Sequence, residues 1–256
     1  TFNYFMKTLL ITGGSGFLGK NLAKKLSKKF HVVLGSRNNN QNRIASLDTS
    51  CEVVPLDVTS SQSVQDIFQY TKPNIVIHAA ATKYVDISED NPHETIDVNI
   101  LGSQIISRLA INNKIETVIG ISTDKTAPPV GNLYGMSKAV MERLFLALNS
   151  KSDTNFSCVR FGNIAWSTGS VFPVWDEMMV KNNFIESTGP NMQRFFFTCD
   201  EASDLVIRCL KHINKTKGNI LIKEMKCAKI SDILDIWSKK YNVDWSQNKT
   251  SINQYD

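Results

Sequence analysis

The sequence predicts an α/β fold, a Rossmann-type doubly wound parallel sheet with a small C-terminal substrate-binding region. Three observations support this prediction: a glycine-rich turn follows the first apolar run, short apolar runs then alternate with helical periods, and the alternation weakens after residue 163. Alternating strands and helices are typical of a parallel sheet with helices on both faces. We therefore expect a Rossmann domain over residues 1–162 and a mainly substrate-binding region, interleaved with the sheet, over residues 163–256.

The first strand and the turn after it predict a dinucleotide site. Residues 7–12 are apolar and β-rich, glycines follow at positions 13, 16 and 19, and a helical period then runs to residue 29. In this context the first glycine permits the tight turn, the second lets the backbone approach a pyrophosphate, and the third allows close helix–strand packing. The helix N-terminus favours the phosphate charge. The residues expected at the cofactor here are Gly13, Ser15, Gly16, Phe17 and Leu18.

The end of the second strand (residues 31–35) predicts which dinucleotide binds. Ser36 and Arg37 stand where an NAD site usually carries an acidic residue for the ribose hydroxyls. A permanently charged guanidinium with several donors suits a 2′-phosphate instead. We therefore expect NADP rather than NAD, which makes residues 1–162 an NADP-binding domain. Asp57 and Val58 follow the third strand (51–56) and are expected near the adenine.

Tyr134 and Lys138 are the first candidates for catalysis. They are four residues apart and therefore share one face of a helix. A nearby ammonium stabilises tyrosinate, so we expect Lys138 to lower the pKa of Tyr134 from its free value of about 10. The pair alone is a weak signal, but the glycine turn near the N-terminus strengthens it. Tyr134 is thus predicted to act as a general base.

Capping residues and periodicity predict the middle elements. Serines at the start of residues 60–70 are suitable caps for a helix, and residues 74–79 form a buried apolar strand. A long helix is expected over residues 92–113, from isoleucines at helical spacing. A strand over 115–122 and a helix over 134–148 complete the alternation.

The pattern changes after a sixth strand over residues 156–161. Residues 164–200 contain two tryptophans and three consecutive phenylalanines with weak periodicity, and we expect them to bind substrate. A helix over 201–213, a strand over 219–223 and a helix over 231–241 follow.

Composition excludes several other classes of protein. The chain has 256 residues and 42% hydrophobic residues, enough for the core of one large α/β domain. Its net charge of +5 is dispersed, and without a basic run no nucleic-acid binding is expected. Five cysteines without Cys-x-x-Cys spacing argue against a metal site or disulfides. Without a signal peptide or an apolar run of about 18 residues, we expect a cytoplasmic protein that does not span a membrane.

With these motifs in hand, the chain resembles the extended short-chain dehydrogenase/reductases. Within them it is similar to the inverting 4,6-dehydratases of UDP-N-acetylglucosamine. The Asp124-Lys125 pair is the subgroup signal, because the common epimerases seldom have it after their Ser or Thr. The segments that carry the resemblance are residues 80–83, 91–92, 122–125, 134–138, 159–163, 169–173, 192–195 and 218–230.

Two departures from the family pattern affect the prediction. The loop over residues 126–133 is one residue longer than is usual in the family, which affects the shape of the loop and its fit to the substrate. An Arg-Pro-Gly-Glu-Lys-like segment that usually follows is absent, so either the chain is truncated or its late substrate contacts differ.

The resemblance implies a role for each candidate residue. Tyr134 is the base for the sugar O4 proton, Thr123 hydrogen-bonds O4, and Lys138 holds the nicotinamide ribose. Asp124 protonates the departing C6 hydroxyl, and Lys125 handles the C5 proton. By family position, the further residues expected to contact the cofactor are Ala79, Ala80, Ala81 and Lys83. Those expected to contact the substrate are Lys83, Asn163, Ser170, Val171 and Arg194.

Lys83 and Arg194 are the candidates for the diphosphate, whereas Arg160 is a weaker one, expected within a strand or turn. Asn99 is expected either to brace the site or to contact a ligand. The resemblance also implies surface glycan synthesis and a homo-oligomer.

Two other functions stay open. A C4 epimerase or reductase acting on the same sugars would use Thr123, Tyr134 and Lys138 without needing Asp124-Lys125. A non-catalytic NADP-binding regulator would typically have lost the tyrosine or the lysine, and both are present. The identity of the UDP-sugar and the stereochemistry at C5 are not predicted.

Overall fold

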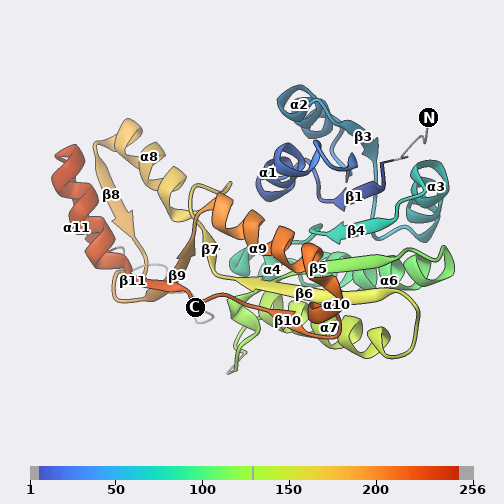
Figure 1. Cartoon of the computed structure of the whole chain (residues 1–256). Coiled ribbons are helices and arrows are strands. Elements are labelled where there is room, and N and C mark those ends of the chain that lie inside the picture. Colours follow the sequence, from blue (N-terminus) through green and yellow to red (C-terminus); the bar gives the residue numbers. More distant parts are fainter. Residues whose placement is uncertain (1–5, 129, 248–256) are drawn as a thin grey trace.

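A computed structural model describes residues 6–128 and 130–247, and within them a seven-stranded sheet runs in the order β10-β6-β5-β4-β1-β2-β3 (Figure 1). All of its pairings are parallel. The order reverses between β1 and β4, which opens a crevice at the carboxyl ends of the strands. The predicted fold class is thereby confirmed. The strands are β1 (Thr8–Thr12), β2 (His31–Ser36), β3 (Glu52–Pro55), β4 (Ile75–His78), β5 (Thr117–Thr123), β6 (Asn155–Phe161) and β10 (Ile220–Leu221).

Helices cover both faces of this sheet. None of those in the described part of the chain is long and apolar enough to cross a membrane. The helical segments are α1 (Phe17–Leu26), α2 (Asn39–Thr49), α3 (Ser61–Thr71), α4 (Val85–Asp90), α5 (Pro92–Thr95), the π-helical η1 (Ile96–Leu101), α6 (Gly102–Asn112), the 3₁₀ turn η2 (Asp124–Thr126), α7 (Leu133–Asn149), α8 (Val171–Asn182), α9 (Cys199–Lys211), α10 (Ile213–Thr216) and α11 (Ile230–Tyr241).

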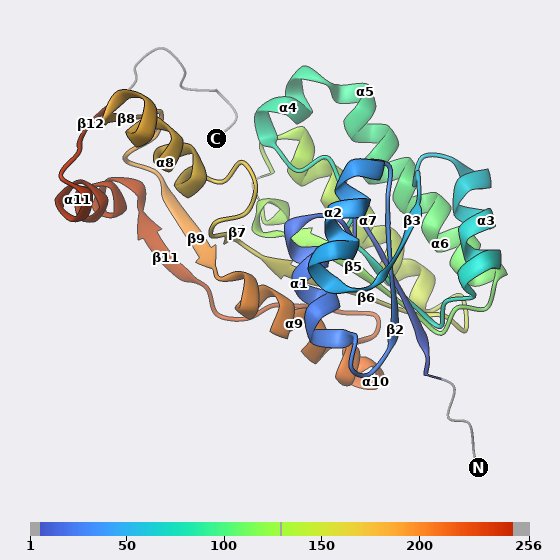
Figure 2. The ribbon, with the colours of Figure 1, turned by 90° about the horizontal axis from the view of Figure 1, so that it is seen from above.

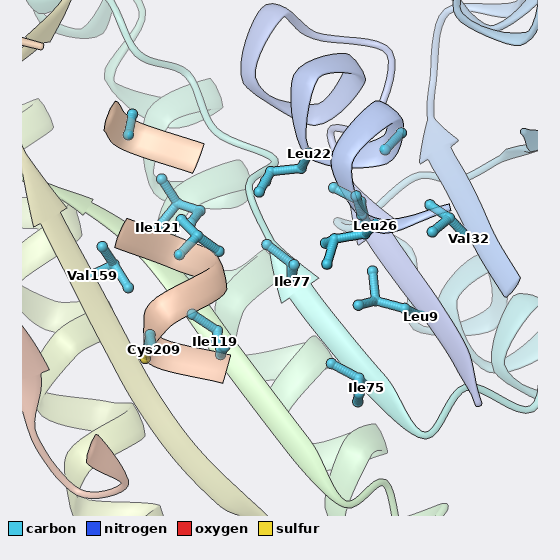
Figure 3. Close-up of a cluster of buried hydrophobic side chains, with 14 of the residues drawn as sticks. Leu9, Leu22, Leu26, Val32, Ile75, Ile77, Ile119, Ile121, Val159 and Cys209 are labelled. Atoms are coloured by element: carbon cyan, nitrogen blue, oxygen red, sulfur yellow. The ribbon is translucent and has the colours of Figure 1, made fainter. Parts of the chain in front are cut away.

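The alternation of side chains along β1 shows how the two faces are filled. Leu9 and Ile11 point to the cluster formed with α1 and α9, which Figure 3 shows in close-up. Leu10 points to the opposite cluster, formed with α3, α6 and α7. All three side chains are fully buried, and each contributes about 1.5–3 kcal/mol of transfer free energy.

The C-terminal elements lie to one side of the sheet (Figure 2). Here β7 (Asn163–Ile164), β9 (Gln193–Phe197) and β11 (Lys226–Lys229) form a small sheet, and β8 (Phe184–Ser187) pairs with β12 (Asp244–Gln247). They enclose their own apolar cluster, centred on buried Trp175 and Leu234. The chain returns to the main sheet through α9, which packs on α1, and through β10, which pairs with β6.

The helical predictions need correction in several places. No helix is predicted at α2, α4, α8 or α10; in α2 the buried residues are only Asn42 and Ala45, and in α8 only Trp175 is buried, so neither helix has a clear hydrophobic period. The long helix expected over residues 92–113 is confirmed as an unbroken helical run over residues 92–112, but it contains the π-helical turn η1, where buried Asn99 forms hydrogen bonds to two other segments. Such wide turns often occur at functional sites. Residue 129 of the long loop and residues 248–256 of the predicted substrate region lie outside the described residues.

Candidate active site

The glycine turn between β1 and α1 is shaped for a phosphate group. Gly13 has φ of 67°, and a Cβ there would lie 2.8 Å from the Cα of Ala80. A Cβ at Gly19 would lie 2.5 Å from the carbonyl oxygen of Gly14, so this glycine allows α1 to approach the turn closely. The N-cap of α1 is Gly16, which supplies no side-chain cap, and the first turn carries no acidic residue. The end of the helix therefore presents backbone N–H groups and a positive dipole without a competing carboxylate.

A cavity of about 700 Å³ extends from this turn to the end of β5. Its size and its glycine-lined floor fit a dinucleotide, so the residues present suit the predicted cofactor. The predicted cofactor residues that line it are Gly13, Ser15, Gly16, Phe17, Leu18, Ala79, Ala80, Ala81, Lys83, Tyr134 and Lys138. Those that do not line it are Ser36, Arg37, Asp57 and Val58.

The four remaining candidates lie around the ends of β2 and β3. The Nη2 of Arg37 donates to Oε1 of Glu94 at 2.8 Å, and this ion pair raises the pKa of the guanidinium. Because Glu94 lines the cavity, the pair stands at its edge. Asp57 accepts from the backbone and hydroxyl of Thr59 at 2.9 and 2.8 Å, and Val58 is buried in the core. The positions of Asp57 and Val58 are thus explained by the fold alone.

The hydroxyl groups beside Arg37 are already hydrogen-bonded to one another. Ser36 donates to Oδ1 of Asn42 at 2.6 Å, and Ser15 lies 2.6 Å from the Ser36 hydroxyl. Since the Ser36 proton is used by Asn42, Ser15 is the donor in the second bond. This chain ties the glycine turn to the end of β2.

Tyr134, Lys138 and Thr123 meet at the end of β5. Thr123 is the last residue of that strand, and its side chain lies beside that of Tyr134 in the first turn of α7. Desolvation raises the pKa of Tyr134 to about 12, and the nearby Thr123 hydroxyl opposes this rise. Burial lowers the pKa of Lys138 to about 8. The prediction that Lys138 lowers the pKa of Tyr134 is therefore wrong for the protein alone, because desolvation sets that pKa and the Lys138 ammonium contacts the Met141 sulfur at 3.7 Å.

Asp124 and Lys125 follow Thr123 in the turn η2. The Lys125 Nζ lies 3.6 Å from Oδ1 of Asp124 and donates to Oδ1 of Asn163 at 3.4 Å. The Thr123 hydroxyl donates to Asp124 at 3.0 Å. Lys125, Thr123 and Tyr134 line the first cavity, whereas Asp124 lines neither cavity and adjoins it through Thr123 and Lys125. A base and a phenol that converge in one cleft can serve proton transfers at neighbouring atoms of a bound molecule.

A second cavity of about 520 Å³ adjoins the first, and Lys83, Lys125 and Asn163 line both. All of the predicted substrate residues line it, namely Lys83, Asn163, Ser170, Val171 and Arg194. Ser170 is the N-cap of α8 but makes no cap bond, and its buried Oγ has no hydrogen-bond partner among the described residues. A helix N-terminus with an unsatisfied hydroxyl and two nearby cations suits an anionic ligand.

Asn99 and His78 support the site from beneath. Fully buried Asn99 donates to Thr82 and to the Ser137 hydroxyl, both at 2.9 Å, and lines neither cavity. Of its two predicted roles, the bracing one is confirmed. Burial lowers the pKa of His78 to about 3, so the ring is neutral and lies 2.8 Å from the hydroxyl of Thr12. Asn99 thus connects the segment after β4 to α7, and His78 connects the end of β4 to β1 and to Ser103 of α6.

Sequence reasoning missed several residues that line the cavities. Tyr84 is one of them, and it donates a hydrogen bond to the carbonyl oxygen of Thr168 at 2.8 Å, as the predicted Lys83 also does. Desolvation lowers the pKa of Lys83. Gly169 has φ of 71°, and a Cβ there would lie 2.5 Å from the Tyr84 ring. No local pattern indicates these contacts. The other lining residues without a predicted role include Thr82, Ile87, Glu94, Ile121, Thr188, Gly189, Met192 and Phe196.

Comparisons with known proteins cover nearly the whole chain. A family model described as "Polysaccharide biosynthesis protein" matches residues 9–254. The chain is 35% identical over 213 residues to the capsular polysaccharide biosynthesis protein CapD of Staphylococcus aureus, a match that covers 79% of this chain and 35% of CapD. It is 32% identical over 253 residues to the UDP-glucose 4-epimerase of Rickettsia rickettsii, covering 93% of this chain and 73% of that protein.

The solved structure of Pen from Bacillus thuringiensis is similar throughout. Its TM-score is 0.88 at 28% sequence identity, and the match covers 98% of this chain and 80% of that one. The glycine turn, the Tyr134–Lys138 pair and both cavities lie within the shared fold.

Proposed function

The chain belongs to the polysaccharide biosynthesis family of extended short-chain dehydrogenase/reductases, and from this premise we propose that it is a nucleotide-sugar 4,6-dehydratase. Its substrate is a UDP-N-acetylhexosamine, in the first place UDP-N-acetylglucosamine, and its product is a 4-keto-6-deoxy sugar for surface glycan synthesis. The observation that carries the proposal is the Asp124–Lys125 pair: Lys125 lines both cavities, and Asp124 lies 3.6 Å from it behind the cavity wall.

NADP is the proposed cofactor, held by the glycine turn at the pyrophosphate and by Lys138 at the nicotinamide ribose. When bound, it accepts a hydride from the sugar C4 and returns one to C6. Tyr134 takes the O4 proton, and Thr123 hydrogen-bonds the same oxygen. The positive charge of the oxidised nicotinamide opposes the desolvation that raises the pKa of Tyr134.

Elimination is assigned to the residues of η2. The C4 carbonyl makes the C5 proton acidic, and Lys125 removes it. Asp124 protonates the C6 hydroxyl, which leaves as water when the C6–O bond breaks. Lys125 returns the proton to C5 once C6 is reduced. The separation of 3.6 Å between the two side chains lets them serve two adjacent carbons of one sugar, C5 in the ring and C6 outside it.

The diphosphate is assigned to the N-terminus of α8 with Arg194 and Lys83. The unpartnered Ser170 hydroxyl and the backbone N–H groups of the first turn provide donors, and the two cations balance the charge. Asn163, which already contacts Lys125, then borders the sugar.

Incubation of the protein with UDP-N-acetylglucosamine and NADP⁺, followed by NMR, tests the proposal. We expect a 4-keto-6-deoxy product without net NADPH, and its loss in Lys125→Ala. Lys181→Ala is the matched control, because that lysine is 71% exposed on the outside of α8. A 4-epimer with C6 intact would instead identify an epimerase, a candidate that the Rickettsia relative supports. NADPH binding without turnover of this or other UDP-sugars would identify a non-catalytic regulator.

The choice of NADP over NAD is tested at Arg37. We expect Arg37→Ala to weaken NADP⁺ binding by about 10–100-fold, the value of a charge-assisted hydrogen bond, and to change NAD⁺ binding little. Glu94→Gln should tighten NADP⁺ binding, because it removes a carboxylate that competes for the guanidinium at 2.8 Å. Titration of protein fluorescence with each dinucleotide measures both effects. Equal losses of NADP⁺ and NAD⁺ in Arg37→Ala would contradict the assignment.

A further inference from the structure

An ion pair between buried Glu142 and partly buried Arg160 joins the three elements that carry the candidate active site. Glu142 lies on α7, four residues after Lys138, and is 3% exposed. Arg160 on β6 donates to it through two parallel bonds, Nε to Oε1 and Nη2 to Oε2, each 2.6 Å long. This bidentate geometry fixes the orientation of both groups as well as their distance.

The same carboxylate holds both sides of the turn η2. The hydroxyl of Ser122, just before Thr123, donates to its Oε1 at 2.5 Å. The hydroxyl of Thr126, just after Lys125, lies 3.4 Å from the same oxygen and donates to the Thr123 carbonyl at 2.7 Å. Residues 123–125 are thus held on either side by groups that converge on Glu142.

We propose that the Glu142–Arg160 pair is a positioning device that sets the turn of Asp124 and Lys125 relative to Tyr134 and Lys138. Neither Glu142 nor Arg160 is among the described residues that line the two cavities. The pair therefore acts through its neighbours. Arg160 also lies three residues before Asn163, whose amide oxygen accepts a hydrogen bond from Lys125. One carboxylate therefore relates the catalytic helix, the end of β5 and the end of β6.

Stability alone does not explain why such a pair is kept. An apolar pair of similar volume is often as stable as a buried ion pair, because desolvation of the two charges offsets their attraction. Removing one partner is costly, since it leaves a buried charge uncompensated. A double replacement therefore separates the contribution of the pair to folding from its contribution to geometry.

The test compares Glu142→Met/Arg160→Met and Arg160→Lys with the parent protein. Arg160→Lys keeps the charge but loses the bidentate contact with Glu142. This variant tests the proposal if the double variant fails to fold. We expect both variants to keep NADP binding and the KM for the sugar within about threefold, whereas kcat falls by about 100-fold, the effect of a misplacement of about 1 Å. Val76→Ala, at a fully buried position of β4 that makes no hydrogen bond to the pair through its side chain, is the control that lowers the melting temperature without lowering kcat.

Hydrogen–deuterium exchange of residues 122–126 provides a second readout that needs no turnover. The inference rests on the proposed function for its kinetic part only. Exchange in these residues should be about tenfold faster in Arg160→Lys and unchanged in Val76→Ala, whichever reaction the protein catalyses. Unchanged kcat and unchanged exchange in Arg160→Lys would overturn the inference. Faster exchange in a protein that turns over no UDP-sugar would support it and reject the proposed function.

Discussion

Replacement of Tyr134 by phenylalanine is expected to lower kcat by about 1,000-fold, within the range that a general base contributes. The substitution removes only the phenolic oxygen, which lies beside the Thr123 side chain, and keeps the ring in place. Binding of NADP should stay within about threefold, because the glycine turn and the rest of the cavity are untouched. Single-turnover kinetics, with a separate titration of the dinucleotide, measure the two effects independently.

The exposed Tyr70 supplies the control for this experiment. Its side chain is 70% exposed on α3, so Tyr70→Phe should leave kcat unchanged. In the parent protein the ionised fraction of Tyr134 rises with pH, since its pKa is about 12, and kcat/KM should rise with it above neutral pH. A Tyr134→Phe variant that keeps kcat within tenfold of the parent would remove the residue from the proposed mechanism.

Gly135→Ala is expected to destabilise the fold and to impair activity together. Gly135 lies directly after Tyr134 in the first turn of α7, where a Cβ would overlap the carbonyl oxygen of Lys125 and lie 3.1 Å from its carbonyl carbon. The contact is with backbone, so the helix or the turn η2 must move. Overpacking of this kind costs about 1–3 kcal/mol, or roughly 2–12 °C in melting temperature for a chain of this size.

Gly131→Ala is the matched control, because a Cβ at Gly131 meets nothing within 4 Å. Thermal unfolding and kcat should therefore match those of the parent protein in this variant. The displacement in Gly135→Ala separates Lys125 from Tyr134, so its product formation should fall more than its melting temperature accounts for. Equal behaviour of the two alanine variants would show that the junction of α7 and η2 tolerates a methyl group.

Local patterns along the chain were sufficient to predict the main sheet, and together with the family resemblance they predicted fewer than half of the residues that line the cavities. The apolar run of residues 7–12 and the glycines after it form a pattern of about a dozen positions. The positive φ of Gly13 agrees with the turn that this pattern predicts. The spacing of Tyr134 and Lys138 needed only the helical period. By contrast, α2 was missed because its few buried residues form no apolar stripe. The helix over 92–113 was predicted, but nothing in its local pattern marks the π-helical turn η1 within it.

What the sequence by itself determined is therefore the fold class, the glycine turn and the set of residues that gather at the ends of the strands. These depend on backbone conformation and on periodicity, which short segments encode. The tertiary structure alone decided which distant groups became partners, such as Glu94 for Arg37, Thr168 for Tyr84 and Arg160 for Glu142. It also decided that desolvation, and not the neighbouring ammonium, dominates the pKa of Tyr134. Contacts between separate elements and the burial of a titratable group both depend on how the whole chain packs, and no local spacing contains that information.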